Sequence, residues 1–382
     1  MEEQHGREYR VNVDWLQSRQ DGLMSHVGNY TGTAHLLNSQ QFLISSLGET
    51  TQGWVLFERV KDLYSKKEPE PLISTNVAVM LSIACTLLYV VPLYMSKASR
   101  PSPTLSRDAP SVIKYRVRAV MTACFICSLG TLYLIVSKGH TTYLEALRLL
   151  GWWPLGPLEI VKSLFLTAIL FLGFLFERGV AEGQWRNWIR WQSLIEPLTE
   201  WAGWRNYVAG PITEEVVFRS IIVALHLMAK ISPTSIVFVS PLYFGIAHVH
   251  HFYEFKLTHA YAPLGTMLFR TVFQFAYTTI FGWYAAFLYL RTGSLFAVIA
   301  VHSFCNCCGL PRLWGRVQVD MPIEPIIVRG KEDEEFPAQR VEQKQLGIGW
   351  TVAYYVILVA GAVVFWSQLW PLTESPLALA SF

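Results

Sequence analysis

Residues Gly210 to Arg219 read GPITEEVVFR and open a strongly apolar segment of the chain. The carboxylates of Glu214 and Glu215 and the guanidinium at the end of the stretch therefore lie at the mouth of a hydrophobic helix. Charged groups are costly inside a membrane, so their presence there indicates a functional site. Pro211 suits a first helical turn, because the backbone N–H that proline lacks would have no acceptor within the helix at this position.

The composition of the chain is that of a membrane protein. Its 382 residues are 52% hydrophobic and only 15% charged, whereas soluble domains carry about 25% charged residues. The mean hydropathy of +0.31 and several long apolar runs predict an all-α polytopic protein in a lipid bilayer. A net charge of +3, without a basic stripe interleaved with aromatics, argues against a nucleic-acid partner.

The apolar runs predict about eight transmembrane helices around one intramembrane active site. Their expected ranges are 75–96, 117–137, 158–176, 211–229, 232–250, 263–290, 294–309 and 349–370. Ser294 is expected to cap the start of the seventh helix, and Gly309 to stop it.

Three domains follow from this pattern: a polar segment over 1–74, a transmembrane domain over 75–372 with its core motifs within 205–312, and a tail over 373–382.

The connections between spans set the expected orientation. Lys and Arg gather in the loops 97–118, 177–205 and 310–348, so these loops are predicted to face the cytosol. Segment 177–205 alternates arginines with tryptophans and is predicted to be an interfacial helix, whereas 310–348 reads as a polar loop. Both termini are then lumenal, in agreement with a glycosylation sequon at Asn29. Four polar residues fall at one depth on the cytosolic side: Glu214, His248, His302 and Asn306.

The two adjacent acids have different expected roles. Glu215 and Arg219 are four residues apart on a helix, and this spacing favours an ion pair. Glu214 is rotated about 100° away and is left as a candidate general base. The plain alternative is that both acids only terminate the span at the membrane interface.

Two further segments supply candidate partners. His248 follows Gly245 and Ala247, small residues that allow a neighbouring helix to approach closely, and could share in activating a water. His302 and Asn306 share one helix face and could donate to an oxyanion. The plain alternatives are an interfacial histidine and an interhelical hydrogen bond.

A zinc site formed by Glu214, His248 and His302 is the main chemical rival. However, the helical turn with two histidines and an intervening glutamate that is typical of zinc proteases is absent. Among other polar residues, His226 reads as a packing residue or a residue at the lumenal end of its helix, and Arg270 and Gln274 could line a cavity.

The segments 214–219, 244–248 and 302–306 resemble, in order, the three motifs of the type II CaaX prenyl endopeptidases. The fuller strings 244–251 and 300–311 are similar to the eukaryotic Ras-converting branch, and the resemblance covers roughly 150–312. It implies a glutamate-dependent intramembrane protease of the CPBP/ABI superfamily in the endoplasmic reticulum membrane, with its active site facing the cytosol.

The implied substrates are farnesylated or geranylgeranylated CaaX proteins such as small GTPases, which lose their last three residues. No cofactor and no metal are implied. By motif position the resemblance implies water activation by Glu214 and His248, oxyanion stabilisation by His302 and Asn306, and support of the site by Glu215 and Arg219.

Two alternatives belong to other functional classes. A non-proteolytic membrane scaffold of the same superfamily would tolerate loss of Glu214. A proton-coupled transporter would use Glu214, Glu215 and the histidines as a relay, but these residues gather near one membrane face and do not form a path across it.

Overall fold

The computed structural model describes residues 70–97, 99–100, 107–322, 326–329, 335–338 and 341–382. The described elements belong to one compact unit, Pro71–Phe382. The sequon at Asn29 and nearly all of the polar segment 1–74 lie outside the described residues.

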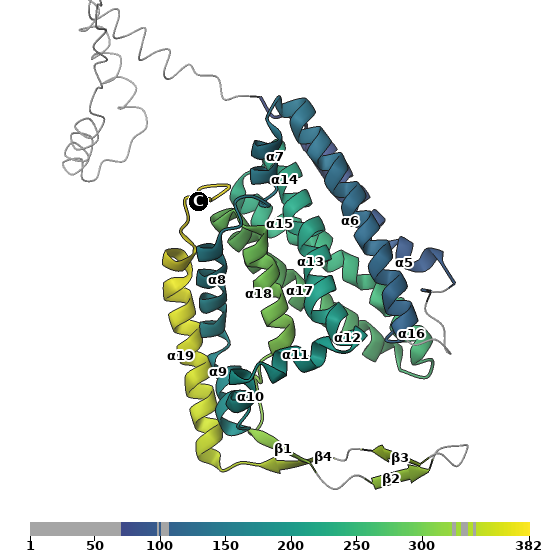
Figure 1. The fold of residues 1–382 in the computed structure, drawn as a ribbon, viewed down its shortest axis with the longest axis vertical. Helices are drawn as coiled ribbons and strands as arrows, with labels where there is room; N and C mark the ends of the chain where they lie inside the picture. Colours follow the sequence, from purple (N-terminus) through teal and green to yellow (C-terminus); the bar gives the residue numbers. More distant parts are fainter. Residues whose placement is uncertain (1–69, 98, 101–106, 323–325, 330–334, 339–340) are drawn as a thin grey trace, which may run out of the picture. The chain divides into compact units, whose positions relative to one another are not determined.

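Helices make up most of the described chain (Figure 1). The first part forms α4 (Thr75–Val90), α5 (Pro92–Met95), α6 (Pro110–Gly139), α7 (Tyr143–Leu149), α8 (Pro157–Leu170), α9 (Leu172–Leu175) and the π-helical turn η1 (Phe176–Ala181). The middle part forms α10 (Trp185–Ile189), α11 (Gln192–Leu198), α12 (Trp201–Trp204), the π-helical turn η2 (Arg205–Ala209), α13 (Gly210–Glu215), the π-helical turn η3 (Val216–Ile221) and α14 (Ile222–Met228). The last part forms α15 (Pro233–Ala247), the 3-10 turn η4 (His248–His250), α16 (His251–Thr258), α17 (Leu264–Thr292), α18 (Leu295–Cys308) and α19 (Ile348–Thr373).

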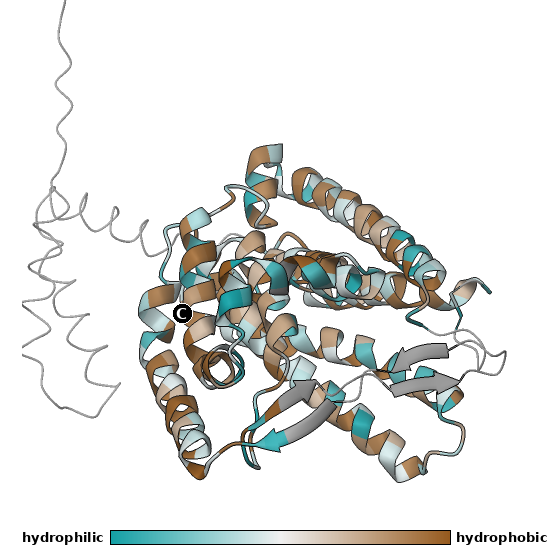
Figure 2. Ribbon diagram, turned by 60° about the horizontal axis from the view of Figure 1, so that its bottom comes forward, coloured by the Kyte–Doolittle hydropathy of each residue, from teal (hydrophilic) through white to brown (hydrophobic). Residues whose placement is uncertain are grey.

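Three helical stretches among the described residues are long and apolar enough to cross a membrane: Thr75–Met95, Pro110–Gly139 and Ile348–Thr373. A fourth arises if Pro157–Leu170 and Leu172–Ala181, which are bent by 75° at their break, form one span. Apolar residues run along most of the length of the long helices (Figure 2). The chain is therefore an all-α membrane protein. Helices also occupy the other predicted spans, but a total of eight crossings stays a prediction.

Local sequence signals place several helix ends where they were predicted. Ser294 caps α18, because its hydroxyl accepts the backbone N–H of Ala297 at 3.2 Å. Gly309 ends that helix with a positive φ of 68°, a conformation that glycine adopts without steric cost. Pro211 occupies the first turn of α13, as expected. Such signals depend on neighbouring residues only, so the sequence alone reveals them.

The prediction of a single interfacial helix over 177–205 is wrong. The segment is divided into η1, α10, α11, α12 and the start of η2. Gly183 and Trp191 have positive φ angles of 74° and 60°, and a left-handed residue ends a helix. Pro197 lies inside α11, where it removes a backbone donor.

The segment 310–348 is not only a polar loop. It contains β1 (Gln318–Pro322), which pairs antiparallel with β4 (Val341–Gln345), and β2 (Ile326–Arg329), which pairs antiparallel with β3 (Glu335–Ala338). Three of the four residues of β2 are β-branched, and such residues favour strands. The charge pattern that indicated a loop did not reveal this pairing.

The core is centred on η3 and α14. Along this stretch Val217, Ile221, Ile222, Val223 and Ala224 are fully buried. A helix that is hydrophobic on all sides is expected in the interior of a bundle, and α4, α6, α15 and α18 pack around this one. The core helix is continuous with α13, so the acids of α13 enter the interior together with it.

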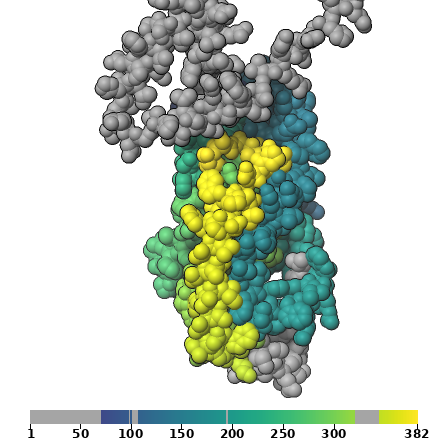
Figure 3. Space-filling model, turned by 90° about the vertical axis from the view of Figure 1, so that its left-hand side faces the viewer, coloured from purple at the N-terminus to yellow at the C-terminus, as the bar shows by residue number. Residues whose placement is uncertain are grey.

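The C-terminal helix α19 packs along α8 (Figures 1 and 3). Gly361 allows this approach, because a Cβ atom at this position would lie 2.5 Å from the backbone oxygen of Ile169 and 3.3 Å from the Cβ of Leu172. The two helices can approach this closely only where a side chain is missing.

We expect Gly361→Ala to lower the free energy of unfolding by about 1–3 kcal/mol through overpacking. Thermal unfolding in detergent would measure the change. Gly349→Ala is the matched control on the same helix, because a Cβ there meets no atom within 4 Å. Equal stability of the two variants would contradict this account of the α8–α19 contact.

Candidate active site

A buried ion pair lies at the junction of α13 and η3. Arg219 donates from Nη1 to Oε1 of Glu215 at 2.9 Å, and both side chains are almost fully buried. The guanidinium also lies 4.4 Å from the ring centroid of Phe244 and 5.5 Å from that of Phe281. The predicted ion pair is confirmed, and aromatic faces shield it from solvent.

His302 of α18 contacts both acids of α13. Its Nδ1 lies 2.6 Å from Oε1 of Glu215, and its Nε2 lies 3.7 Å from Oε2 of Glu214. A carboxylate that accepts from Arg219 can also accept a second donor, so Nδ1 of the histidine donates to Glu215. The imidazole thus links the buried acid to the neighbouring acid on the same helix.

Glu214 faces a cavity of about 380 Å³, while Glu215 faces the core. One residue of advance along a helix turns the side chain by about 100°, which separates the two carboxylates onto different faces. Oε2 of Glu214 still contacts His302, and its side chain is 21% exposed. Glu214 is therefore the acid that a ligand in the cavity could reach.

His248 lies on the wall of the same cavity. Its Nδ1 is 2.8 Å from the backbone oxygen of Phe244. Because a carbonyl oxygen only accepts, Nδ1 carries the proton, and the neutral ring leaves Nε2 as an acceptor. The end of α15 thus supplies a nitrogen base with a defined tautomer.

Asn306 also lines the cavity. Its Nδ2 donates to the backbone oxygen of Asn206 at 2.9 Å. An amide nitrogen has two hydrogens, so one donor remains beyond this contact. The bond to the segment before α13 holds the end of α18 next to the acids.

The predicted site residues separate into two groups. Glu214, His248 and Asn306 share the cavity wall, whereas the wall does not include His302, Glu215 or Arg219. His302 is 5% exposed and lies between the cavity acid and the buried pair. The sequence predicted that these residues gather, and they do, but their catalytic roles stay predictions.

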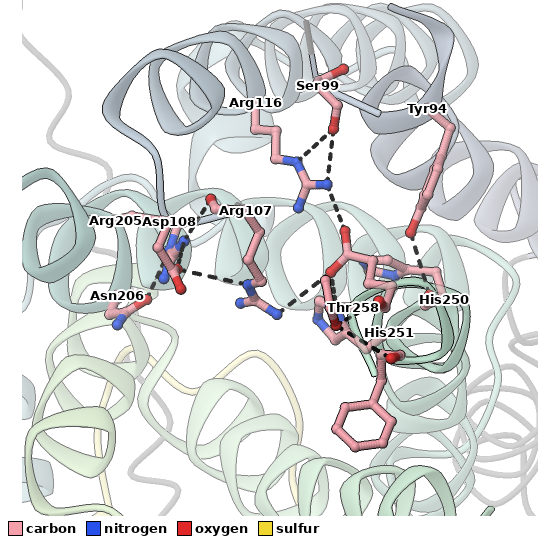
Figure 4. A network of polar contacts seen from close by, with 12 residues as sticks. Tyr94, Ser99, Arg107, Asp108, Arg116, Arg205, Asn206, His250, His251 and Thr258 are labelled. Carbon is pink, nitrogen blue, oxygen red and sulfur yellow. Dashed lines mark hydrogen bonds and ion pairs between the residues drawn. The ribbon is translucent and has the colours of Figure 1, made fainter. Parts of the chain in front are cut away.

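Arg107, Arg116 and His251 on the cavity wall form a second polar network with Glu254, which the sequence did not predict (Figure 4). Arg116 lies 2.6 Å from Oε1 of Glu254, and Arg107 lies 3.5 Å from its Oε2. Nδ1 of His251 lies 2.9 Å from the same Oε2. Burial favours the neutral form of Glu254, but His251 and Arg116 outweigh it and hold the pKa of that carboxyl below its ordinary value.

The missed residues had weak signals in the sequence. Arg107 and Arg116 counted there only as indicators of a cytosolic loop. His251 and Glu254 are three residues apart, a spacing that places them on one helix face. Position along the chain could not reveal that this face meets the start of α6.

The donor atoms of His250, His251 and Glu254 lie within 4.8 Å of one another. Within the described ranges, the zinc set of Glu214, His248 and His302 forms no comparable group. Glu254 is already paired with Arg116 at 2.6 Å, so its charge is compensated by the protein itself.

Three further polar residues of the sequence lie away from the site. His226 is buried, with Nδ1 at 2.7 Å from the backbone oxygen of Ile222. Arg270 lies over the ring of Phe255, 4.3 Å from its centroid, and neither it nor Gln274 lines this cavity. The suggestion that Arg270 and Gln274 line a cavity therefore finds no support at this cavity and stays a prediction.

Comparisons with known proteins agree with the motifs. The family model of the Rce1-like type II CAAX prenyl endopeptidases matches residues 196–308. A probable CAAX prenyl protease 2 of Schizosaccharomyces pombe is 34% identical over 295 residues, which cover 77% of this chain and 93% of that protein. The CAAX prenyl protease 2 of Homo sapiens is 36% identical over 249 residues, covering 62% and 71% of the two chains. That of Saccharomyces cerevisiae is 28% identical over 320 residues, covering 76% and 94%. No solved structure matches the chain.

We expect Arg219→Met to lower the free energy of unfolding by about 3–5 kcal/mol, because it leaves a buried carboxylate without its cation. Thermal unfolding in detergent would measure the loss. Arg178→Met removes the arginine of another pair with i,i+4 spacing, which lies at 2.8 Å from Glu182 with 47% of the arginine side chain exposed. This control should cost about 0–1 kcal/mol, and a similar small loss in both variants would contradict the buried pair's importance.

Proposed function

Because the chain belongs to the type II CAAX prenyl endopeptidase family, we propose that it releases the C-terminal aaX tripeptide from farnesylated or geranylgeranylated CaaX proteins by attack of an activated water. The chain is a multi-pass membrane CaaX prenyl endopeptidase. The observation that carries the mechanism is the shared cavity wall of Glu214, His248 and Asn306. Family membership favours the protease over the scaffold and the transporter.

Glu214 and His248 activate the water in this proposal. The carboxylate accepts a proton from the water, and Nε2 of the neutral imidazole is an acceptor on the same wall. Attack on the scissile carbonyl gives a tetrahedral oxyanion, and the abstracted proton then passes to the leaving amine. Two bases on one wall allow one to hold the water while the other returns the proton.

Asn306 and His302 stabilise the oxyanion. The second amide hydrogen of Asn306 is available for this, since the first is directed at Asn206. His302 donates from Nε2 when both of its nitrogens are protonated, and its Nδ1 stays bonded to Glu215. Donors that are held in place before the reaction stabilise developing charge at no cost of reorganisation.

Glu215 and Arg219 act as positioning residues. Oε1 of Glu215 accepts from Arg219 at 2.9 Å and from His302 at 2.6 Å. This shared acceptor fixes the imidazole beside Glu214 without touching the substrate. Supporting hydrogen bonds of this kind lock the geometry of the groups that react.

The substrates we propose include small GTPases, and the location is the endoplasmic reticulum membrane with the cavity open to the cytosol. Support comes from the basic loops 97–118 and 177–205, which the distribution of Lys and Arg assigns to the cytosolic side. Arg107, Arg116 and Arg205 of these loops line the cavity. A cytosolic cavity meets the tails of cytosolic proteins that their lipid inserts in the bilayer.

We expect Glu214→Ala to lower cleavage of a farnesylated CaaX peptide by about 10²–10⁴-fold, the usual contribution of a general base. The purified full-length chain would be assayed in detergent, with and without a metal chelator, and the wild type should stay active in both. Glu196→Ala, an exposed acid on α11, is the control. Wild-type rates in Glu214→Ala, or activity lost to chelator and restored by zinc, would refute the glutamate mechanism.

We expect Asn306→Ala to lower kcat by about 10²–10³-fold with little change in KM, because an oxyanion donor acts mainly in the transition state. Steady-state kinetics on the same peptide would separate the two constants. Asn187→Ala, whose amide bonds Gln184 away from the cavity, should behave as wild type. A change confined to KM would argue for substrate binding instead.

A further inference from the structure

One side of the cavity carries three arginines that the proposed chemistry does not use. Arg107, Arg116 and Arg205 line the same cavity as Glu214 and His248. They come from the start of α6, the residues just before it, and the start of η2. The base and the oxyanion donors of the proposed hydrolysis are other residues, so these cations have no role in it as described so far.

Two of these arginines are held by close partners. Arg116 donates from Nε and Nη2 to the backbone oxygen of Ser99 at 3.2 and 3.0 Å and lies 2.6 Å from Glu254. Arg205 donates to Asp108 at 2.9 Å and to Asn206 at 2.9 Å. Close partners of this kind fix both side chains in place.

Arg107 differs from the other two. Its contacts with carboxylates within the described chain are long, at 3.5 Å to Glu254 and 3.8 Å to Asp108, and its side chain is 40% exposed. Figure 4 shows it between the cluster of Arg205 and Asp108 and the cluster of Arg116 and His251. Its guanidinium can therefore reorient toward a ligand with little loss of hydrogen-bond energy, because only these two long contacts with the described carboxylates would be given up.

The charges in this region favour an anion. Three guanidinium groups face two carboxylates, Asp108 and Glu254, in the network. Within the described part of the chain, this network therefore has one more positive than negative charge, and it lies on the wall of the cavity that the catalytic candidate Glu214 also lines. Arginine binds carboxylates through two parallel hydrogen bonds. A carboxylate therefore fits this position better than a monatomic anion such as chloride does.

The substrate of the proposed reaction carries such a group. A CaaX tail ends in a free α-carboxylate, and cleavage three residues from that end places it within about 10–11 Å of the scissile bond. A cavity of about 380 Å³ is at the small end of ligand pockets, which span about 300–1,000 Å³. One ligand can therefore contact both the acid and the arginines of such a cavity.

We propose that Arg107, with Arg205 beside it, binds the C-terminal α-carboxylate of the substrate and so sets the cleavage point at the third residue from the end. Arg116 holds Glu254 and is a positioning residue. The inference rests on the proposed function and adds recognition of the chain end to it. The prenyl group and the carboxylate then fix the peptide at both ends of the segment that is cut.

The test compares two prenylated peptides that differ only in a C-terminal carboxylate or amide. The wild-type full-length protein should cleave the carboxylate peptide with a kcat/KM about ten- to a hundredfold higher, as expected for hydrogen bonds between charged groups. Arg107→Gln should lose most of this ratio through a higher KM for the carboxylate peptide, with the amide peptide nearly unaffected. Arg107→Lys keeps the positive charge but loses the pair of parallel hydrogen bonds that a guanidinium donates. It should retain part of the carboxylate-to-amide ratio of kcat/KM.

Arg118→Gln is the matched control, because it removes an exposed arginine of α6 that does not line the cavity. Its carboxylate-to-amide ratio should equal that of the wild type. Equal cleavage of both peptides by the wild type would overturn the proposal, and so would an unchanged ratio in Arg107→Gln. Failure of the glutamate mechanism is a separate outcome, because it is measured by Glu214→Ala and leaves the ratio of the wild type intact.

Discussion

The buried carboxylate of Glu215 is the interaction on which the site depends. Its Oε1 accepts from Arg219 on its own helix and from His302 on α18. A charge in the core is tolerable only when such partners satisfy it. The two donors come from different elements. Oε1 of Glu215 therefore also fixes the position of α18 relative to α13. With Glu215 fixed toward the core, the helix geometry directs the side chain of Glu214 toward the cavity.

This arrangement separates the tasks of the site by position. The ion pair of Glu215 and Arg219 is buried and holds His302, the cavity wall carries Glu214, His248 and Asn306, and the arginine side of the cavity carries positive charge. In the proposed mechanism, the residues of the cavity wall and His302 are the groups that react with or stabilise the substrate. Backbone oxygens hold two of these groups: that of Phe244 in α15 holds His248, and that of Asn206 in η2 holds Asn306. Support from backbone atoms and buried ions lets reactive groups keep their geometry in a partly open cavity.

Much of the site was predictable because its signals are short-range. The i,i+4 spacing of Glu215 and Arg219 predicted their ion pair, and adjacent positions on a helix predicted that Glu214 would point elsewhere. Three ordered motifs indicated the family. The same reasoning was wrong for 177–205, where left-handed residues at Gly183 and Trp191 interrupt the helix, and for 310–348, where strands pair.

The sequence by itself determined the membrane class, most of the long helices, the capping residue Ser294 and the set of polar residues that gather at the site, because composition, periodicity and spacing act along the chain. Only the tertiary structure decided that His302 lies behind Glu214 and off the cavity wall, that Asn306 bonds to Asn206, and that Arg107 shares a cavity with the acids. These facts depend on which helix faces meet across the bundle. Helix packing joins residues about 100 positions apart, and no local pattern carries that information.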